Sequence, residues 1–331
     1  MKQLIQKLVE TVGPSGYESA VRDLVRGEIE GLVDEIRVDA LGSLIARKGH
    51  KAADGLRIML SAHMDEIGVI ATHVDEKGFV RFTTIGGVRP HTCIGGRVRF
   101  LSGVQGLIYM ERSEDASRLP GIENLYIDVG AADRESCPVK VGDLAAFERP
   151  FLDLGSRMVS KAMDDRISVA VLIETLRQIK TSPHELYFVF STQEEVGLRG
   201  ATTAAYGIDP DLGVAVDVTA TGDTPKGLRM EVALGKGPAI KVRDGGMLSD
   251  PRVVRWMVET AEAAGLPYQL EVLEGGTTDA RAIQLARAGV PSGCVSIPTR
   301  YIHSPSEMVD YGDVQNAVRL LAALLSGPVK L

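Results

Sequence analysis

The chain has 331 residues, of which 44% are hydrophobic and 24% are charged, and its formal net charge is −7. These values are typical of a globular protein with two domains, or with one large domain that carries an insertion. No block of Lys and Arg residues and no long apolar run occurs, which argues against nucleic acid as the main partner and against membrane spans. The cysteines Cys93, Cys137 and Cys294 lie far apart. We therefore expect a cytoplasmic protein without a disulfide framework.

The first part of the chain predicts two helices followed by strands. Residues 1–8 place charges inside an apolar stretch and lack a signal-peptide pattern, so we interpret them as an amphipathic helix of the fold. A second helix is expected over 18–30 and a hairpin over 37–46, with its turn at Gly42. A short buried strand over 57–62 would then lead directly into His63.

Short alternating segments replace this pattern between residue 69 and about residue 155. Turns rich in Gly, Pro and Asp separate strand-like runs, and no helix is evident; the runs cover 78–84, 97–100, 104–109, 125–129 and 143–147. This texture is typical of a small all-β barrel or sandwich. We therefore expect an inserted β domain over 69–156, between two parts of a catalytic domain over 1–68 and 157–331.

Helices and strands alternate from residue 165 onward. The pattern predicts helices over 167–179, 200–206, 251–264, 279–288 and 314–325, and strands over 186–191, 212–217, 268–273 and 293–297. Such alternation is typical of an α/β domain, in which helices cover a mixed or mostly parallel central sheet.

Five short segments place His, Asp or Glu at the end of a strand-like apolar run. They cover residues 61–66, 161–166, 191–197, 215–217 and 301–305. Ligands bind in the crevice at the carboxyl ends of the strands of an α/β sheet, so these side chains are expected to meet there. Two His and several carboxylates form a ligand set that suits Zn, Co or Mn.

Taken alone, some of these residues can be explained without a metal ion. His63 and Asp65 would lie on one side of a strand, either as a metal ligand with its orienting carboxylate or as a solvated acidic loop. Asp164 and Asp165 could simply begin a helix, where acidic residues are common. His303 could be an ordinary loop residue.

Other residues point more directly to a cation. Glu194 and Glu195 follow a strongly apolar strand, where two adjacent carboxylates repel unless a cation holds them. Asp217 ends an apolar strand that carries no other charge. Taken together, the five segments supply the parts of a two-metal hydrolase, namely a bridging carboxylate, terminal ligands on each side and a free carboxylate base.

With these motifs, the chain resembles the tetrahedral (TET) aminopeptidases, metallopeptidase family forty-two. Members of this family are also labelled glutamyl, leucyl or deblocking aminopeptidases, and sometimes endoglucanases. The resemblance runs from residues 14–18 to residues 301–305, and its motifs occur in the family's order. It implies a zinc-exopeptidase-like fold whose inserted β-barrel serves oligomerisation.

The resemblance also implies a role for each site residue. Two divalent ions per subunit (Zn, Co or Mn) would be held, with His63 and Asp217 on one ion, Glu195 and His303 on the other, and Asp164 bridging both. Glu194 would be the general base and Asp65 would orient His63. A glycine-rich segment over 275–280 would lie near the substrate, with Gly276, Thr277 and Asp279 as candidate substrate-binding residues.

These residues predict hydrolysis of a peptide bond by a metal-activated water molecule. The resemblance restricts cleavage to the first residue of a peptide whose α-amino group is free. A metal-dependent deacylase of N-acyl peptides or amino acids could use the same site and would need no free amine. A glycosidase would need two carboxylates that flank a sugar, whereas Glu194 and Glu195 diverge along a strand and the chain has a single Trp. A scaffold that has lost its metals is disfavoured, because every expected ligand is present.

The inserted β domain also predicts assembly into a homo-oligomer. A small β domain buries little core alone and is often stabilised by pairing with its own copy. The resemblance implies dimers built into a hollow twelve-subunit tetrahedron that admits peptides. Residues 86–91 could then reach a neighbour's site, with His91 as a candidate contributor and an exposed loop histidine as the alternative.

Overall fold

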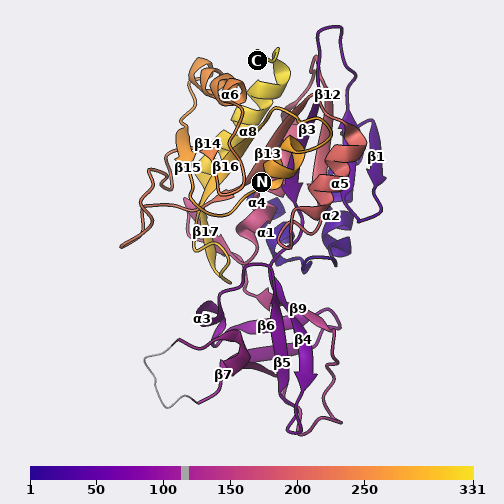
Figure 1. Ribbon diagram of the computed structural model, residues 1–331, viewed down its shortest axis with the longest axis vertical. Helices are drawn as coiled ribbons and strands as arrows, with labels where there is room; N and C mark the ends of the chain where they lie inside the picture. The colour runs from indigo at the N-terminus through magenta and orange to yellow at the C-terminus, as the bar shows by residue number, and fades with distance from the viewer. Residues whose placement is uncertain (113–118) are drawn as a thin grey trace.

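The computed structural model describes residues 1–112 and 119–331, which form an α/β body and a smaller barrel at one end of it (Figure 1). The body is built on an eleven-stranded mixed sheet, and the barrel is closed by six antiparallel strands. The predicted fold class, α/β with an inserted β-barrel, is therefore confirmed.

Four parallel strands form the centre of the large sheet and determine where the site lies. Strands β12, β3, β13 and β16 are neighbours and run in the same direction, so their carboxyl ends share one edge. The full order is β1-β2-β12-β3-β13-β16-β17-β11-β10, with β14 paired to β16 and β15 paired to β14. The strands of this sheet are β1 (Glu35–Val38), β2 (Leu44–Lys48), β3 (Arg57–His63), β10 (Leu152–Asp153), β11 (Arg157–Ser160), β12 (Glu185–Ser191), β13 (Leu212–Thr219), β14 (Ala239–Arg243), β15 (Gln269–Val272), β16 (Ser292–Arg300) and β17 (Glu307–Asp310).

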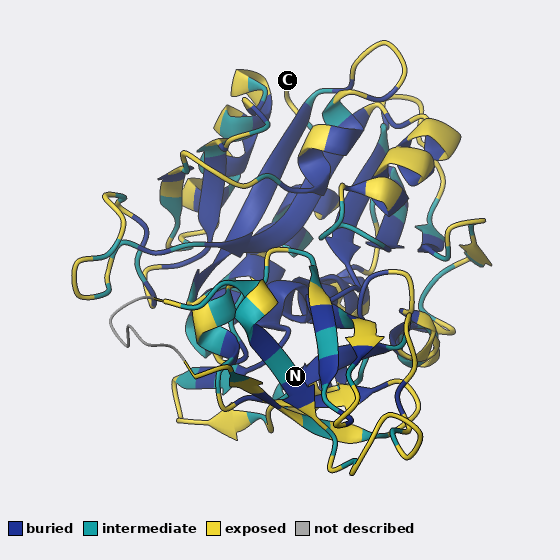
Figure 2. Cartoon of the chain, turned by 60° about the horizontal axis from the view of Figure 1, so that its bottom comes forward, coloured by how far each residue is buried: buried dark blue, intermediate teal, exposed yellow. Residues whose placement is uncertain are grey.

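Helices cover both faces of this sheet. The α-helices of the described residues are α1 (Lys2–Glu10), α2 (Ser19–Ile29), α3 (Pro90–Cys93), α4 (Met163–Gln178), α5 (Arg199–Ile208), α6 (Pro251–Ala263), α7 (Asp279–Gln284) and α8 (Tyr311–Ser326). In β3, Ile58 and Leu60 join the core beneath α1, α2, α4, α6 and α8, whereas Met59 joins the core beneath α5 and α7. This alternation follows from the two-residue period of a strand. Figure 2 shows the resulting pattern, with buried central strands and exposed residues on the outer helix surfaces.

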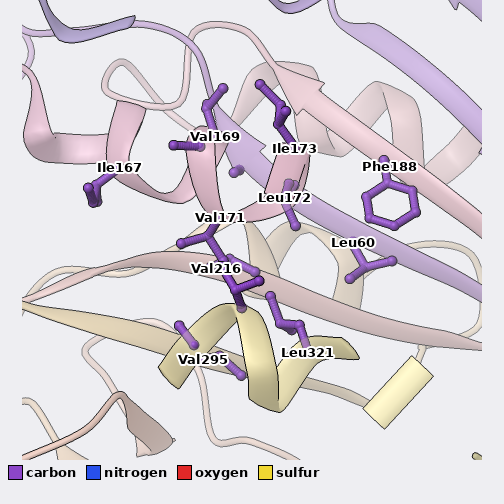
Figure 3. Close-up of a cluster of buried hydrophobic side chains, with 14 of the residues drawn as sticks. Leu60, Ile167, Val169, Val171, Leu172, Ile173, Phe188, Val216, Val295 and Leu321 are labelled. Atoms are coloured by element: carbon purple, nitrogen blue, oxygen red, sulfur yellow. The ribbon is translucent and has the colours of Figure 1, made fainter. Parts of the chain in front are cut away.

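Helix α4 lies at the centre of the larger core and carries the first acidic segment of the site. Its side chains Val171 and Leu172 meet Leu60 of β3, Val216 of β13 and Leu321 of α8 (Figure 3). Full burial of one such side chain contributes about 1.5–3 kcal/mol, so the start of α4 is held firmly over the sheet.

The barrel consists of β4 (Gly68–Val74), β5 (Val80–Ile85), β6 (Arg97–Phe100), β7 (Gln105–Met110), β8 (Leu125–Asp128) and β9 (Leu144–Glu148), closed in the order β4-β5-β8-β7-β6-β9. In β6, Val98 and Phe100 fill the barrel core while Arg97 and Arg99 face outward. This is the alternation that predicted a β domain here. The domain boundaries at 69 and 156 stay a prediction; β10 already pairs with β11 in the large sheet.

Several elements differ from those expected from the sequence. Helix α7 ends at Gln284 rather than near residue 288, because the chain turns at Arg287 and Gly289, which both have positive φ. The short strands β11, β14 and β17 were not predicted, because they contain charged residues. They form through pairing with strands that are distant in the sequence. A single turn of helix, α3, interrupts the barrel segment.

Two further observations bear on the class of protein. Over residues 1–112 and 119–331, no helix is both long and apolar enough to cross a lipid bilayer. The thiols of Cys93, Cys137 and Cys294 are free, and those of Cys93 and Cys294 are buried.

Candidate active site

The predicted ligands meet at the shared carboxyl edge of the central strands. His63 is the last residue of β3, and Asp217 lies near the end of β13, which pairs with β3 in parallel. Glu194 and Glu195 follow β12, and His303 follows β16. The strand-end pattern in the sequence therefore placed all of these residues at the correct edge of the sheet.

The carboxylate of Asp164 lies between the two imidazoles. Its Oδ1 is 3.0 Å from Nε2 of His63, and its Oδ2 is 3.4 Å from Nε2 of His303. Asp164 lies in the first turn of α4 and not, as the sequence suggested, at the end of a strand. One carboxylate whose two oxygens face two separate imidazoles has the arrangement expected of a bridging ligand.

Glu195 completes the side of the site that contains His303. Its Oε2 lies 3.2 Å from Nε2 of His303. Glu194, the preceding residue, places Oε2 at 3.8 Å from Nε2 of His63. The two adjacent carboxylates thus diverge, as expected for neighbours in an extended segment.

Asp65 lies behind His63. Its Oδ1 is 3.4 Å from Nδ1 of His63, whose Nδ1 is also 3.1 Å from the backbone oxygen of Asp65. The same carboxylate accepts hydrogen bonds from the hydroxyl of Ser15 and from the backbone N–H groups of Glu194 and Glu195. Asp65 therefore holds together His63 and the loop that carries both glutamates.

Two groups of side chains offer the geometry of a metal site. His63, Asp164 and Glu195 can bring one ligand atom each to within 4.8 Å of one another, and so can His63, Asp165 and Asp217. Asp165 was not singled out from the sequence, where it has the position of a residue in a helix start. It is fully buried, and its Oδ2 also accepts the backbone N–H of His63. The adjacency of two acidic residues after an apolar segment is the signal that could have found it.

Burial and mutual proximity dominate the electrostatics of this cluster. Burial raises the pKa of Asp217 and of Asp165 well above the ordinary aspartate value, and the proximity of Asp164 raises both further. Burial alone would lower the pKa of His63, but the charge of Glu194 and the contact with Asp164 raise it well above its ordinary value. The carboxylates therefore attract positive charge strongly to this point.

The donor set fits divalent metal ions. The site combines two imidazoles with at least four buried carboxylates, a set that suits Zn, Co or Mn. Within the described residues, Oε1 of Glu195 and Oδ1 of Asp165 are buried and accept no hydrogen bond. Buried charged oxygens without partners are costly, and a bound cation would satisfy them.

The barrel contributes a loop to the site. A Cβ atom added at Gly87 would lie 2.3 Å from Nδ1 of His303, and one added at Gly86 would lie 2.9 Å from Oε2 of Glu195. Gly86 has a φ of +74°, a left-handed conformation that glycine adopts readily. Only residues without a side chain fit here, so this loop bounds the outer side of His303 and Glu195.

A cavity of about 940 Å³ opens beside the predicted metal ligands. Its wall includes Gly276 and Thr277, two of the candidate substrate-binding residues, together with apolar side chains such as Leu228 and Met230. Asp279 is instead buried beneath the sheet edge, where its Oδ2 accepts hydrogen bonds from Ser61 and Ser191.

His91 occupies an exposed position on α3 and is not part of the cavity wall, which the barrel reaches through Gly87 and Arg89. Its contribution to a neighbouring subunit's site stays a prediction.

Comparison with known proteins places this chain in a family. The family model described as M42 glutamyl aminopeptidase matches residues 42–320. A putative aminopeptidase of Acetivibrio thermocellus is 47% identical, with 97% of each chain covered. The solved aminopeptidase APDkam598 of the archaeon Desulfurococcus kamchatkensis has a TM-score of 0.94 at 41% identity, covering 98% of this chain and 94% of that one.

A further solved structure is the TET1 peptidase of Pyrococcus horikoshii, described as able to assemble into a tetrahedron or a large octahedral shell. It has a TM-score of 0.88 at 31% identity, with 98% of each chain covered. The family model spans most of the chain, and the relatives match it from end to end. The chain therefore belongs to the M42 glutamyl aminopeptidase family, which makes it a metalloaminopeptidase.

Proposed function

We propose that this aminopeptidase uses a dinuclear metal site and that Glu194 is its general base. The observation that carries the proposal is the position of Asp164, whose two carboxylate oxygens face His63 at 3.0 Å and His303 at 3.4 Å. A single carboxylate between two imidazoles is suited to bridge two cations.

The surrounding residues divide into two ligand sets. His63 and Asp217 would hold one ion, Glu195 and His303 the other, and Asp164 both. Asp165, which lies within ligand reach of His63 and Asp217, is a further candidate for the first ion. When bound, divalent ions supply Lewis acidity, which polarises a peptide carbonyl and acidifies a water molecule.

Glu194 has the position required of a base. Its side chain lines the cavity and is 11% exposed, so it can meet both the ligand cluster and a substrate. Within the described residues, it belongs to neither of the three-ligand groups. Glu194 would accept a proton from the attacking water and return it to the amine that leaves when the peptide bond breaks.

The substrate is proposed to be a peptide with a free amino end. The cavity has room for several residues of a peptide, and the free α-amino group would be attracted either to a metal ion, as a neutral amine, or to a carboxylate that holds no metal. Such an attraction would place the first peptide bond beside Glu194 and so limit cleavage to the amino end.

The proposal extends to the quaternary structure. The chain would form dimers that assemble into a tetrahedral dodecamer, supported by the closed barrel and by the assembly described for the TET1 peptidase of Pyrococcus horikoshii. Enclosed active sites would then exclude folded proteins and admit peptides. A cytoplasmic location remains the expectation from the cysteines.

The test is hydrolysis of aminoacyl-anilides and short peptides, each with a free and an N-acetylated amino end. The enzyme is stripped of metal and reloaded with Zn, Co or Mn, with metal content measured in parallel. We expect release of the first residue from free amines only, with two ions per subunit. Glu194→Gln should bind the same metal but lower kcat by at least about 100-fold.

Other outcomes would change the assignment. Hydrolysis of the acetylated substrates alone would favour a deacylase on the same site. Full activity with one ion per subunit would contradict the dinuclear mechanism, and undiminished activity of Glu194→Gln would remove its role as the base.

A further inference from the structure

Glu307 lies beneath the ligand cluster and has no role in the mechanism above. It is the first residue of β17, where it pairs with Ser160 of β11, and its side chain is 1% exposed. A carboxylate at such a depth is costly to bury unless it makes strong compensating interactions.

Both oxygens of Glu307 bind backbone groups of two proposed ligands. Oε2 accepts the N–H of Asp164 at 3.0 Å, and Oε1 accepts the N–H of His303 at 2.9 Å. The side chains of these two residues in turn approach each other, with Oδ2 of Asp164 at 3.4 Å from Nε2 of His303. One carboxylate therefore sets the distance between two residues that come from separate elements.

Neither of these backbone positions is held by regular secondary structure. Asp164 has non-helical dihedral angles, φ −76° and ψ 103°, at the start of α4. His303 has a φ of +62°, in the left-handed region that residues with a Cβ rarely occupy. An amide in such a segment lacks a partner from regular secondary structure, and Glu307 accepts both N–H groups.

The charge of Glu307 is not used in an ion pair. Among residues 1–112 and 119–331, no Lys or Arg nitrogen lies within 4.0 Å of its carboxylate; the nearby Lys161 pairs with Glu66 instead. The carboxylate is therefore committed to the two amides.

We propose that Glu307 is a positioning residue that fixes Asp164 and His303 at the separation required to share one metal ion. The inference rests on the proposed function, in which these two residues are ligands. It predicts that loss of the Glu307 carboxylate weakens the site of Glu195 and His303 more than the site of His63 and Asp217. Both residues that Glu307 holds belong to the first site, whereas the second shares only Asp164.

The variant Glu307→Gln tests this proposal. The side chain keeps its shape, but its amide NH₂ cannot accept a hydrogen bond, so one of the two backbone N–H groups loses its acceptor. Asp313→Asn is the matched control. Asp313 is also 1% exposed and accepts two backbone N–H groups, those of Gly235 and Gly237 at 2.7 Å each, but neither residue is a proposed ligand.

The measurement is titration of metal-stripped protein with Zn²⁺ by calorimetry, and with Co²⁺ by its visible absorption. We expect two sites in the unaltered protein. In Glu307→Gln, one site should weaken by about 10–100-fold with a changed Co²⁺ spectrum, while Asp313→Asn keeps both sites unchanged. Activity of Glu307→Gln should return at high metal concentration.

The outcomes separate this inference from the proposed function. If the unaltered protein binds fewer than two ions, the dinuclear proposal fails. If it binds two ions and Glu307→Gln binds both as tightly, or if both variants lose affinity equally, the positioning role is wrong. Should Glu307→Gln not fold, Glu307→Asp replaces it; the shorter side chain cannot span both amides, so the same weakening is expected, and unchanged affinity would again overturn the inference.

Discussion

The carboxylate of Asp65 accepts the backbone N–H of Glu194 at 3.0 Å. The residue that faces Nδ1 of His63 thus also fixes the start of the loop that carries the proposed base. A proposed metal ligand and a proposed base that share one anchor keep their separation when either strand end moves. This relationship couples metal binding to the position of Glu194.

Asp65→Asn should therefore impair both the orientation of His63 and the position of Glu194. The amide keeps the shape of the side chain but replaces an acceptor that serves Ser15, Glu194 and Glu195. We expect kcat/KM to fall by about 10–100-fold, with a parallel loss of metal affinity. Steady-state kinetics and metal titration measure both. A loss of affinity with unchanged kcat at saturating metal would contradict the link to Glu194.

Gly87→Ala tests whether the barrel shapes the active site. The added methyl group would lie 2.3 Å from Nδ1 of His303, so the imidazole or the loop must move. A displacement of about 1 Å at a reacting site costs about 100-fold in rate, which is the fall expected in kcat/KM. The control is Gly207→Ala in α5, where an added methyl group meets no atom within 4 Å. Equal activity of the two variants would show that the barrel loop is not a constraint.

Arg166→Met should lower the free energy of unfolding, because Arg166 lies in the interior of the protein. The Arg166 side chain is fully buried and donates to the backbone oxygens of Leu8, Thr11 and Gly13. Arg166 also lies 3.6 Å from the buried carboxylate of Glu66. Loss of one member of a buried ion pair costs about 3–5 kcal/mol, and each of the three backbone oxygens would also lose a donor. Chemical unfolding of the metal-free protein measures the change.

The control for Arg166→Met is Arg177→Met on the same helix. Arg177 pairs with Glu28 and Glu174 and remains 35% exposed. Its removal should cost no more than about 1 kcal/mol. Similar losses for both variants would contradict the central role of Arg166.

The ion pair between Asp223 and Arg300 gives a pH-dependent prediction. The hydrogen bond from Arg300 lowers the pKa of Asp223 from 3.8 to about 2. A carboxyl group whose pKa is lower in the folded state stabilises the protein above its unfolded pKa, and this contribution is lost as the pH falls through the folded value.

The unaltered protein should thus exceed Asp223→Asn in unfolding free energy at pH 5, and this gap should begin to narrow below about pH 4. Urea unfolding of both proteins across this range measures it. A gap that widens as the pH falls would refute the assignment.

Local sequence patterns predicted much of the site. All but one of the predicted ligand segments end or follow one of the four parallel strands, which bring their carboxyl ends to one edge. The exception is Asp164, in the first turn of α4. His63, Glu195 and Asp217 could therefore be assigned to a common crevice from the order of residues alone. The alternation of Val98 and Phe100 with exposed arginines likewise predicted the barrel, because strand periodicity is a local property.

The sequence by itself determined the chemical character of this protein: a carboxylate-rich crevice with two imidazoles, and an inserted β domain. Only the tertiary structure decided which side chains contact and position one another. Glu307 and Asp164 are 143 residues apart, and no local pattern pairs them. Gly87 meets His303 only because the barrel loop reaches the edge of the large sheet. Periodicity and capping depend on neighbours along the chain, whereas such contacts depend on the packing of distant elements, which is fixed only when the whole core forms.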